Sequence, residues 1–272
     1  LAVPPGPIEL RFDATGSSQP SLASTALELT LTSNTSIGTV TLLPGFTFAG
    51  IVKNTSAVAV FDADIDVFDA LGEKLYTPND NTTASGTFTF KVPAGTFRVE
   101  VCPPFAAHLV STAIQSVVVS GPTSLGTITL QGGVVLSGTL KSHLDVAVPN
   151  ADVDLYVAGT QTPVVLCDDN AAGNGAYQVI VPLGTFDVVF TPPDYSLPLA
   201  KQHVNGFAIT GNTVLNGVLA ACPFSTSYGA GLAGTGGSIP VLASSGGAPR
   251  VGNPGYAWTV SQGLGNSFGV LG

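Results

Sequence analysis

The chain has 272 residues, of which 8 are Lys or Arg and 17 are Asp or Glu, so that its formal net charge is −9. Only 9% of the residues are charged, whereas there are 33 Gly and 20 Pro, a composition that excludes coiled coils and helical bundles. The mean hydropathy of +0.43 excludes a disordered chain, the acidic balance excludes the basic stripes of nucleic-acid-binding proteins, and no apolar run reaches the roughly 18 residues of a membrane span.

Residues 1–42 are predicted to form a partial β module, the back half of a repeat. The segment Thr35–Leu42 (TSIGTVTL) matches Thr123–Leu130 (TSLGTITL) further along the chain. A half-module of this kind exposes an apolar face and open strand edges, so we expect another polypeptide to cover it. The alternative is that the chain is a fragment cut from a longer rod, with ends that merely look incomplete.

Two complete modules are predicted to follow, over residues 43–130 and 131–220. Gly50 and Asp64 have counterparts at Gly138 and Asp152, an offset of 88 residues. The sequence Val-Pro-x-Gly-Thr-Phe begins at Val92 in the first copy and at Val181 in the second, in the same order and nearly the same register.

Each module has the pattern of an all-β domain. Apolar residues alternate with polar ones, and turn residues recur every 8–12 positions. We expect seven short strands and a small Ig-like or prealbumin-like β-sandwich, with strands in the first module near 48–53, 63–68, 74–77, 87–92, 97–102, 114–119 and 125–130. Tandem sandwiches with short linkers favour a stiff rod.

Residues 221–272 are predicted to be a Gly-rich, incomplete β module with strands near 239–242 and 256–260. Such a segment buries little apolar surface by itself, so we expect it to need a partner, either the preceding module or another chain.

The ordered motifs Gly-x-Val/Leu, Ala-Asp-Val/Ile-Asp, Asp-Asn and Val-Pro-x-Gly-Thr-Phe resemble the carboxypeptidase regulatory-like (prealbumin-like) β-sandwich repeats of secreted bacterial surface proteins. The resemblance covers residues 45–130 and 133–220. It implies a non-catalytic, secreted module that serves as an extracellular spacer or in adhesion, with no catalytic residue.

Acidic residues recur at equivalent places in both modules. Two carboxylates spaced by two positions share one face of a strand, and a loop Asp-Asn is predicted to lie at the same pole. Several hard oxygen ligands could hold Ca²⁺ there, whereas the alternative interpretation is a solvent-facing strand and an ordinary turn. The candidate calcium ligands are Asp64, Asp66 and Asp80 in the first module and Asp152, Asp154 and Asp169 in the second.

Three cysteines occur, and the alternation of strand directions places Cys167 and Cys222 at the same pole of one module. The sequence therefore predicts a disulfide between these two residues, which leaves Cys102 free or paired between chains.

These observations favour a non-enzymatic extracellular structural protein that forms a surface fibre from copies of itself, arranged head to tail by strand addition. The alternative is a cell-surface adhesion or glycan-binding spacer. For that function Tyr256 and Trp258, two positions apart on one predicted strand, are the candidate platform for a surface glycan, although core packing also explains them. Neither nucleic acid nor a membrane span is expected, and no cofactor other than Ca²⁺.

Overall fold

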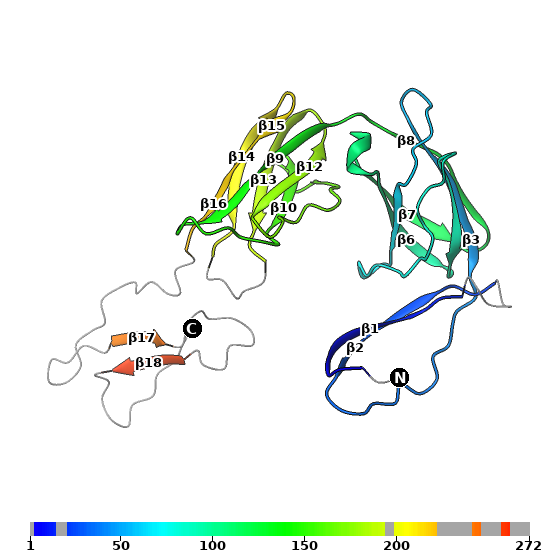
Figure 1. The fold of residues 1–272 in the computed structure, drawn as a ribbon, viewed down its shortest axis with the longest axis horizontal. Helices are drawn as coiled ribbons and strands as arrows, with labels where there is room; N and C mark the ends of the chain where they lie inside the picture. The colour runs from blue at the N-terminus through cyan, green and yellow to red at the C-terminus, as the bar shows by residue number, and fades with distance from the viewer. Residues whose placement is uncertain (1–2, 15–20, 194–198, 222–240, 246–256, 262–272) are drawn as a thin grey trace.

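The computed structural model describes residues 3–14, 21–193, 199–221, 241–245 and 257–261 (Figure 1). Their regular structure is β, apart from the single 3₁₀ turn η1 at Phe105–Ala107, which confirms the predicted all-β class. The described residues include no helix with the length and hydropathy that crossing a bilayer requires.

The first module contains two three-stranded sheets that face each other. One sheet has the order β5-β3-β8, and the other has the order β4-β6-β7. The first and last strands, β3 and β8, are parallel, while the other pairs are antiparallel. The strand bounds are β3 Phe46–Asn54, β4 Asp64–Phe68, β5 Thr87–Val92, β6 Gly95–Cys102, β7 Thr112–Val119 and β8 Thr123–Leu130.

The core of this module is built by the alternating apolar residues of both sheets. Phe48 and Val52 from β3, Ile65 from β4 and Val99 from β6 are almost completely buried. The strand expected over residues 74–77 is reduced to a single bridge between Phe68 and Lys74. Pro78 follows this segment directly, and proline has no N–H with which a ladder could continue.

The second module repeats this arrangement. Its sheets have the orders β12-β9-β15, with β16 also paired to β9, and β11-β10-β13-β14. The last strand, which pairs in parallel with β9, is split into β15 and β16. Between these two pieces the N–H of Thr139 on β9 donates to the side-chain oxygen of Asn216 (2.9 Å) instead of to a backbone carbonyl of the last strand. The strand bounds are β9 Val134–Ser142, β10 Asp152–Val157, β11 Pro163–Val164, β12 Ala176–Val181, β13 Gly184–Thr191, β14 Gln202–Ile209, β15 Thr213–Val214 and β16 Gly217–Leu219.

A two-stranded antiparallel sheet precedes the first module. It consists of β1 (Gly6–Phe12) and β2 (Thr25–Leu31). Residues 34–43 then run to the first module without strand structure. The sheet is tied to that module by the bridge between Leu22 and Pro44 and by the Arg11 guanidinium, which lies 5.1 Å from the centre of the Tyr76 ring.

A second two-stranded antiparallel sheet lies beyond the second module, formed by β17 (Val241–Ser245) and β18 (Ala257–Ser261). Figure 1 shows that the β1–β2 sheet and the two modules bend around an arch. The two modules are therefore not arranged in line in this part of the chain, because the second module lies beside the first rather than at its far end; the stiffness of the expected rod stays a prediction.

Candidate functional site: the junction between the two modules

A disulfide joins the two modules. Cys102, the last residue of β6, is bonded to Cys167, which follows β11, with a Cα–Cα distance of 5.9 Å and 65 positions between them in the sequence. The predicted pairing of Cys167 with Cys222 is therefore wrong, and Cys102 is not left over. The prediction treated each module alone, whereas the modules pack so that Cys102 meets Cys167 across their junction; Cys222 lies outside the described residues.

The linker between the modules is also held by backbone hydrogen bonds. The N–H of Val110 donates to the carbonyl of Gln131 (2.9 Å), and the N–H of Gly133 donates to the carbonyl of His108 (2.8 Å). A Cβ at Gly133 would lie 2.5 Å from Ile180 of the second module and 2.9 Å from Val110 of the first. The linker thus passes through a tight contact, and together with the disulfide it restricts movement of one module against the other.

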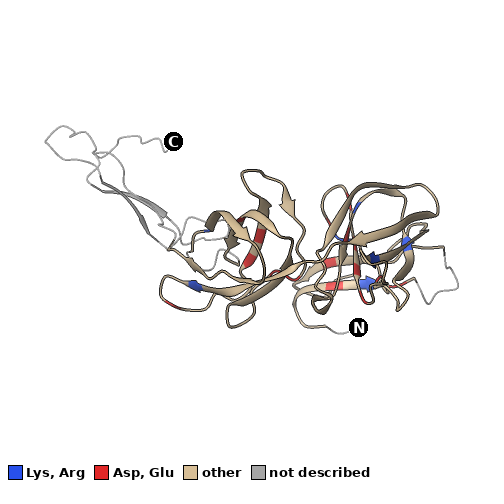
Figure 2. Cartoon of the chain, turned by 90° about the horizontal axis from the view of Figure 1, so that it is seen from above, with Lys and Arg blue, Asp and Glu red and all other residues tan. Residues whose placement is uncertain are grey.

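A cleft of about 1120 Å³ opens at this junction. One wall is acidic and comes from the first module, with Asp62, Asp64, Asp66 and Glu100 beside Lys74. The other wall comes from the second module and is rich in hydroxyl and amide groups. Figure 2 shows acidic residues on the strands that flank the junction. This second wall includes Ser137, Thr139, Asn174, Tyr177, Gln178 and Asn216.

In the first module the predicted calcium ligands lie together, but a lysine lies among them. Asp64 and Asp66 point outward from β4, and the Lys74 ammonium forms an ion pair with Asp66 and lies 3.9 Å from Asp64. Asp80 accepts a hydrogen bond from the Thr77 hydroxyl. Burial, followed by the charges of Asp66 and Asp80, raises the pKa of Asp64 to about 6. The pKa of Lys74 is raised overall because these carboxylates outweigh the effect of burial. Lys74 thus already supplies a cation to this cluster.

In the second module the corresponding carboxylates have no such lysine. Pro163 pairs with Tyr156 where Lys74 bridges Phe68 in the first module. Burial, followed by the charges of Asp152 and Asp154, raises the pKa of Asp169 to about 6. Burial and the charge of Asp152 also raise the pKa of Asp154, although the positive charge of Lys201 partly offsets this rise. The three predicted ligands are thus close enough to repel one another, and Ca²⁺ binding here stays a prediction.

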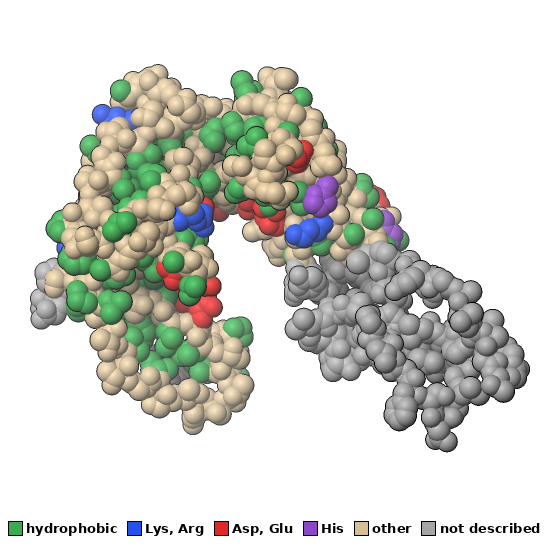
Figure 3. Space-filling model, turned by 180° about the vertical axis from the view of Figure 1, so that it is seen from behind, with side chains coloured by type: hydrophobic (Ala, Val, Ile, Leu, Met, Phe, Trp, Pro, Cys, Tyr) green, Lys and Arg blue, Asp and Glu red, His purple; other side chains and the backbone are tan. Residues whose placement is uncertain are grey.

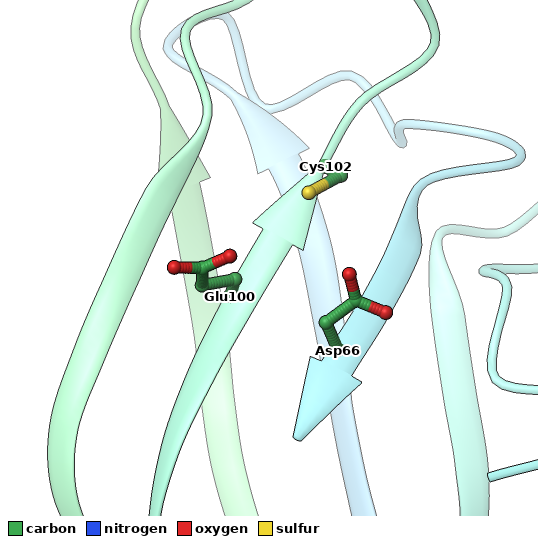
Figure 4. A group of neighbouring side chains, drawn as sticks. All are labelled: Asp66, Glu100 and Cys102. Carbon is green, nitrogen blue, oxygen red and sulfur yellow. The ribbon is translucent and has the colours of Figure 1, made fainter. Parts of the chain in front are cut away.

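Figure 4 shows a further group, in which Asp66, Glu100 and Cys102 bring ligand-type atoms within 4.8 Å of one another. Each of the three already has a partner: Asp66 pairs with Lys74, Glu100 pairs with Arg98, and the Cys102 sulfur is in the disulfide. A metal thiolate needs a deprotonated free cysteine, so this group is best explained as an ion-pair network beside a covalent bridge.

The predicted glycan platform is not described by the structure. Tyr256 lies outside the described residues, and Trp258 lies in β18, where only the backbone is described. Glycan binding by this pair stays a prediction.

No protein-family model matches the chain, and a search of curated proteins found no match. The resemblance to carboxypeptidase regulatory-like repeats therefore stays a prediction.

Among solved structures, the chain is similar to two pilins and to a Bacillus anthracis protein at low sequence identity. The shaft pilin SpaA from Lactobacillus rhamnosus GG is 8% identical, with a TM-score of 0.30 over 67% of this chain and 100% of that one. A streptococcal ancillary pilin is 12% identical, with a TM-score of 0.25 over 81% of this chain and 76% of that one. The Bacillus anthracis TIE protein is 12% identical, with a TM-score of 0.27 over 74% of this chain and 39% of that one, so the chain spans well under half of its length. These similarities concern the fold and assign no function.

Proposed function

We propose that the chain is a non-catalytic extracellular structural protein that polymerises head to tail into a surface fibre by strand complementation. The observation that carries the proposal is the two-stranded β1–β2 sheet. Its inward-alternating residues, such as Ile8, Leu10 and Leu29, are only partly buried, and an isolated two-stranded sheet is marginally stable in water. A partner that covers this apolar face would remove these side chains from water and thereby stabilise both the sheet and the contact.

Two features of the junction support the same function. The disulfide between Cys102 and Cys167 fits an oxidising, extracellular location, because cytosolic thiols are kept reduced. The disulfide and the bonded linker also fix one module against the other, so that a subunit can transmit its orientation to the next one. A fibre needs this property, since a flexible subunit would give irregular assemblies.

Sedimentation velocity and negative-stain electron microscopy on the oxidised full-length chain test the proposal. We expect species larger than the monomer whose length grows with protein concentration, and filaments with a constant axial repeat. Compact monomers at every concentration up to the millimolar range would refute polymerisation of this chain.

A further inference from the structure

The junction cleft contains an open strand edge on the side of the second module. In its sheet, β12 is the strand that lies nearest to the first module (Figure 1), and its consecutive residues 176–180 line the cleft. Among the described strands, β12 pairs with β9 alone. Its other edge is therefore free to pair with an added strand, as the edges of open sheets are.

Backbone alternation shows which groups of β12 face this open edge. The N–H of Leu140 on β9 donates to the carbonyl of Gly175 (2.7 Å), so every second residue from Gly175 onward along β12 faces β9 in the antiparallel register. Gln178 and Ile180 lie between those positions, so their N–H and C=O groups face away from β9. The corresponding groups of Ala176 are bonded to residues of the preceding loop, whereas those of Gln178 and Ile180 have no hydrogen-bond partner among the described residues.

The equivalent strand of the first module, β5, is protected against such pairing. The offset of 89 residues places Lys91 at the position of Ile180 and Thr89 at the position of Gln178. A lysine on an edge strand opposes the addition of another strand, because the charge would lose its hydration. No charged residue occurs in β12, so its edge lacks this protection.

The wall of the cleft that faces β12 is acidic. Asp64 and Asp66 project from β4, and Glu100 lies opposite Asp66 on β6, so the three carboxylates share the outer face of one sheet. Figure 3 shows a hollow on the inner side of the arch, with acidic side chains beside it. The charged residues among the described lining of the cleft are Asp62, Asp64, Asp66, Glu100, Asp168 and Lys74.

The nearby cations do not balance these carboxylates. Lys74 is shared between the two carboxylates of β4, and the carboxylate of β6 pairs with Arg98, which does not line the cleft. Asp62 and Asp168 form no ion pair with a residue that the structure describes. Burial, followed by the neighbouring carboxylates, raises the pKa of Asp64 to about 6. A cationic ligand would relieve this repulsion and is therefore attracted to the wall.

We infer that the cleft binds an extended, lysine- or arginine-bearing segment of another protein, which adds to β12 as a strand. Its backbone pairs with Gln178 and Ile180, and its basic side chains, two positions apart and so on one face, reach the carboxylates of the first module. Cys102 and Cys167 both line the cleft, so their disulfide sets the distance between the walls before the partner arrives.

A second copy of the chain does not suit this edge. The two cations that lie closest together in its sequence are Lys91 and Arg98, seven positions apart, so no segment of the chain presents two basic side chains on one strand face at short spacing. The partner is therefore a different polypeptide. This inference goes beyond the proposed function and does not depend on it.

The probe for the test is a dye-labelled synthetic peptide of alternating lysine and valine, about seven residues long. Titration with the oxidised full-length chain, followed by fluorescence anisotropy, should give saturable binding that weakens as salt is added, because the charges are screened. A peptide of alternating glutamate and valine is the control for charge. The lysine peptide with every backbone amide N-methylated is the control for strand pairing, and neither control should bind.

Two proline variants test the edge itself. Gln178→Pro removes an N–H that faces the cleft and leaves the ladder with β9 in place, a position at which edge strands tolerate proline. It should weaken binding of the lysine peptide at least about tenfold. Thr89→Pro makes the same change at the equivalent position of β5 and should bind like the wild type. Thermal melting checks that both variants keep the two folded modules.

A charge variant tests the acidic lining. Asp62 and Asp168 have φ values of 60° and 54°, a conformation that asparagine also adopts, so Asp62→Asn/Asp168→Asn preserves the backbone. This double variant should bind the lysine peptide about tenfold more weakly. Asp145 has a φ of 61° and does not line the cleft, so Asp145→Asn is the matched control and should leave the affinity unchanged.

Hydrogen exchange followed by NMR identifies the paired edge. The amides of Gln178 and Ile180 should exchange rapidly in the free chain and become protected with saturating lysine peptide, whereas those of Tyr177 and Val179 should be protected in both states by β9. Binding without this alternating protection would overturn strand addition, and so would equal binding by Gln178→Pro or by the N-methylated peptide.

The remaining outcomes concern the identity of the partner. Equal binding of the glutamate peptide, or no binding of the lysine peptide, would overturn the inference. Protection of Gln178 and Ile180 that grows with the concentration of the chain alone would show a second copy in the cleft and would overturn it as well. Fibre formation is not a readout of these experiments, so the inference and the proposed function can fail separately.

Discussion

Removal of the disulfide between Cys102 and Cys167 should destabilise the protein measurably. The bond closes a loop of 65 positions that contains strands of both modules. In the chain-entropy description a loop of this length restricts the unfolded chain by about 4 kcal/mol. The double variant Cys102→Ser/Cys167→Ser should therefore lose up to about 4 kcal/mol in the free energy of unfolding. The modules should also lose their fixed orientation, because one covalent restraint at their junction is gone.

Guanidinium denaturation followed by circular dichroism measures the first effect, and spin-label distances between the modules measure the second. The same measurements under reducing conditions provide a matched comparison, since wild type and variant should then agree. Cys222→Ser is the control and should change neither quantity. Peptide mapping that finds Cys167 bonded to Cys222, or a loss of stability in Cys222→Ser equal to that of the double variant, would refute the pairing.

Three further predictions concern the interior and the acidic clusters. Because the pKa of Asp169 is raised to about 6 in the folded module, stability should fall as the pH rises from about 4 to about 6. Asp169→Asn should then be more stable than the wild type at pH 7.5, by less than about 1 kcal/mol after screening, and equal to it near pH 3.5; equal melting at both pH values would contradict this. If the second module binds Ca²⁺, calorimetry should detect heat in the wild type and less heat in Asp169→Asn, whereas a titration without heat would exclude the site. Val99→Ala should cost about 2 kcal/mol in denaturant unfolding because Val99 is 0% exposed, while Leu10→Ala, at a partly exposed position of β1, should cost under about 1 kcal/mol; equal costs would show that Leu10 is packed as tightly as Val99.

A glycine in β9 supplies another test of the sheet packing. The carbonyl of Leu215 and the ring of Tyr177 lie so close to Gly138 that a Cβ there would overlap them, and the Tyr177 hydroxyl also donates to that carbonyl (2.6 Å). Gly138→Ala should therefore lower the melting temperature of the second module by several degrees. Gly211→Ala, where a Cβ would meet open space, should leave it nearly unchanged. A harmless Gly138→Ala would contradict the close approach of these strands.

The sequence predicts local structure well where the alternation of side chains is regular. The segment Val92–Phe97 indicates a strand, a turn and a second strand, and the structure places β5 and β6 there with Phe97 buried. The segment over residues 74–77 has less regular alternation and ends at Pro78, and it forms only one bridge. Local pattern thus predicts the strands whose faces are buried, and fails for a short edge segment.

Contacts between modules could not be predicted in this way. The cysteine pairing was wrong because it depends on how two separately folded units pack, which strand periodicity does not encode. Lys74 was missed among the carboxylates because it approaches Asp66 across a turn. By contrast, β1 pairs with β2 in the register of β6 with β7, and the sequence signals this: Val3-Pro4-Pro5-Gly6 matches Val92-Pro93-Ala94-Gly95 and extends the repeat found over Thr35–Leu42.

The parallel pairing of β3 with β8 has a consequence for how the chain is made. β3 is the first strand of its module and β8 is the last. The hydrogen-bond ladder between them therefore forms only after almost the whole module has left the ribosome. Until then the apolar side of the earlier strands stays accessible, and any strand of matching direction competes for the same place. A topology sealed by its final segment is therefore suited to exchange between neighbouring polypeptides.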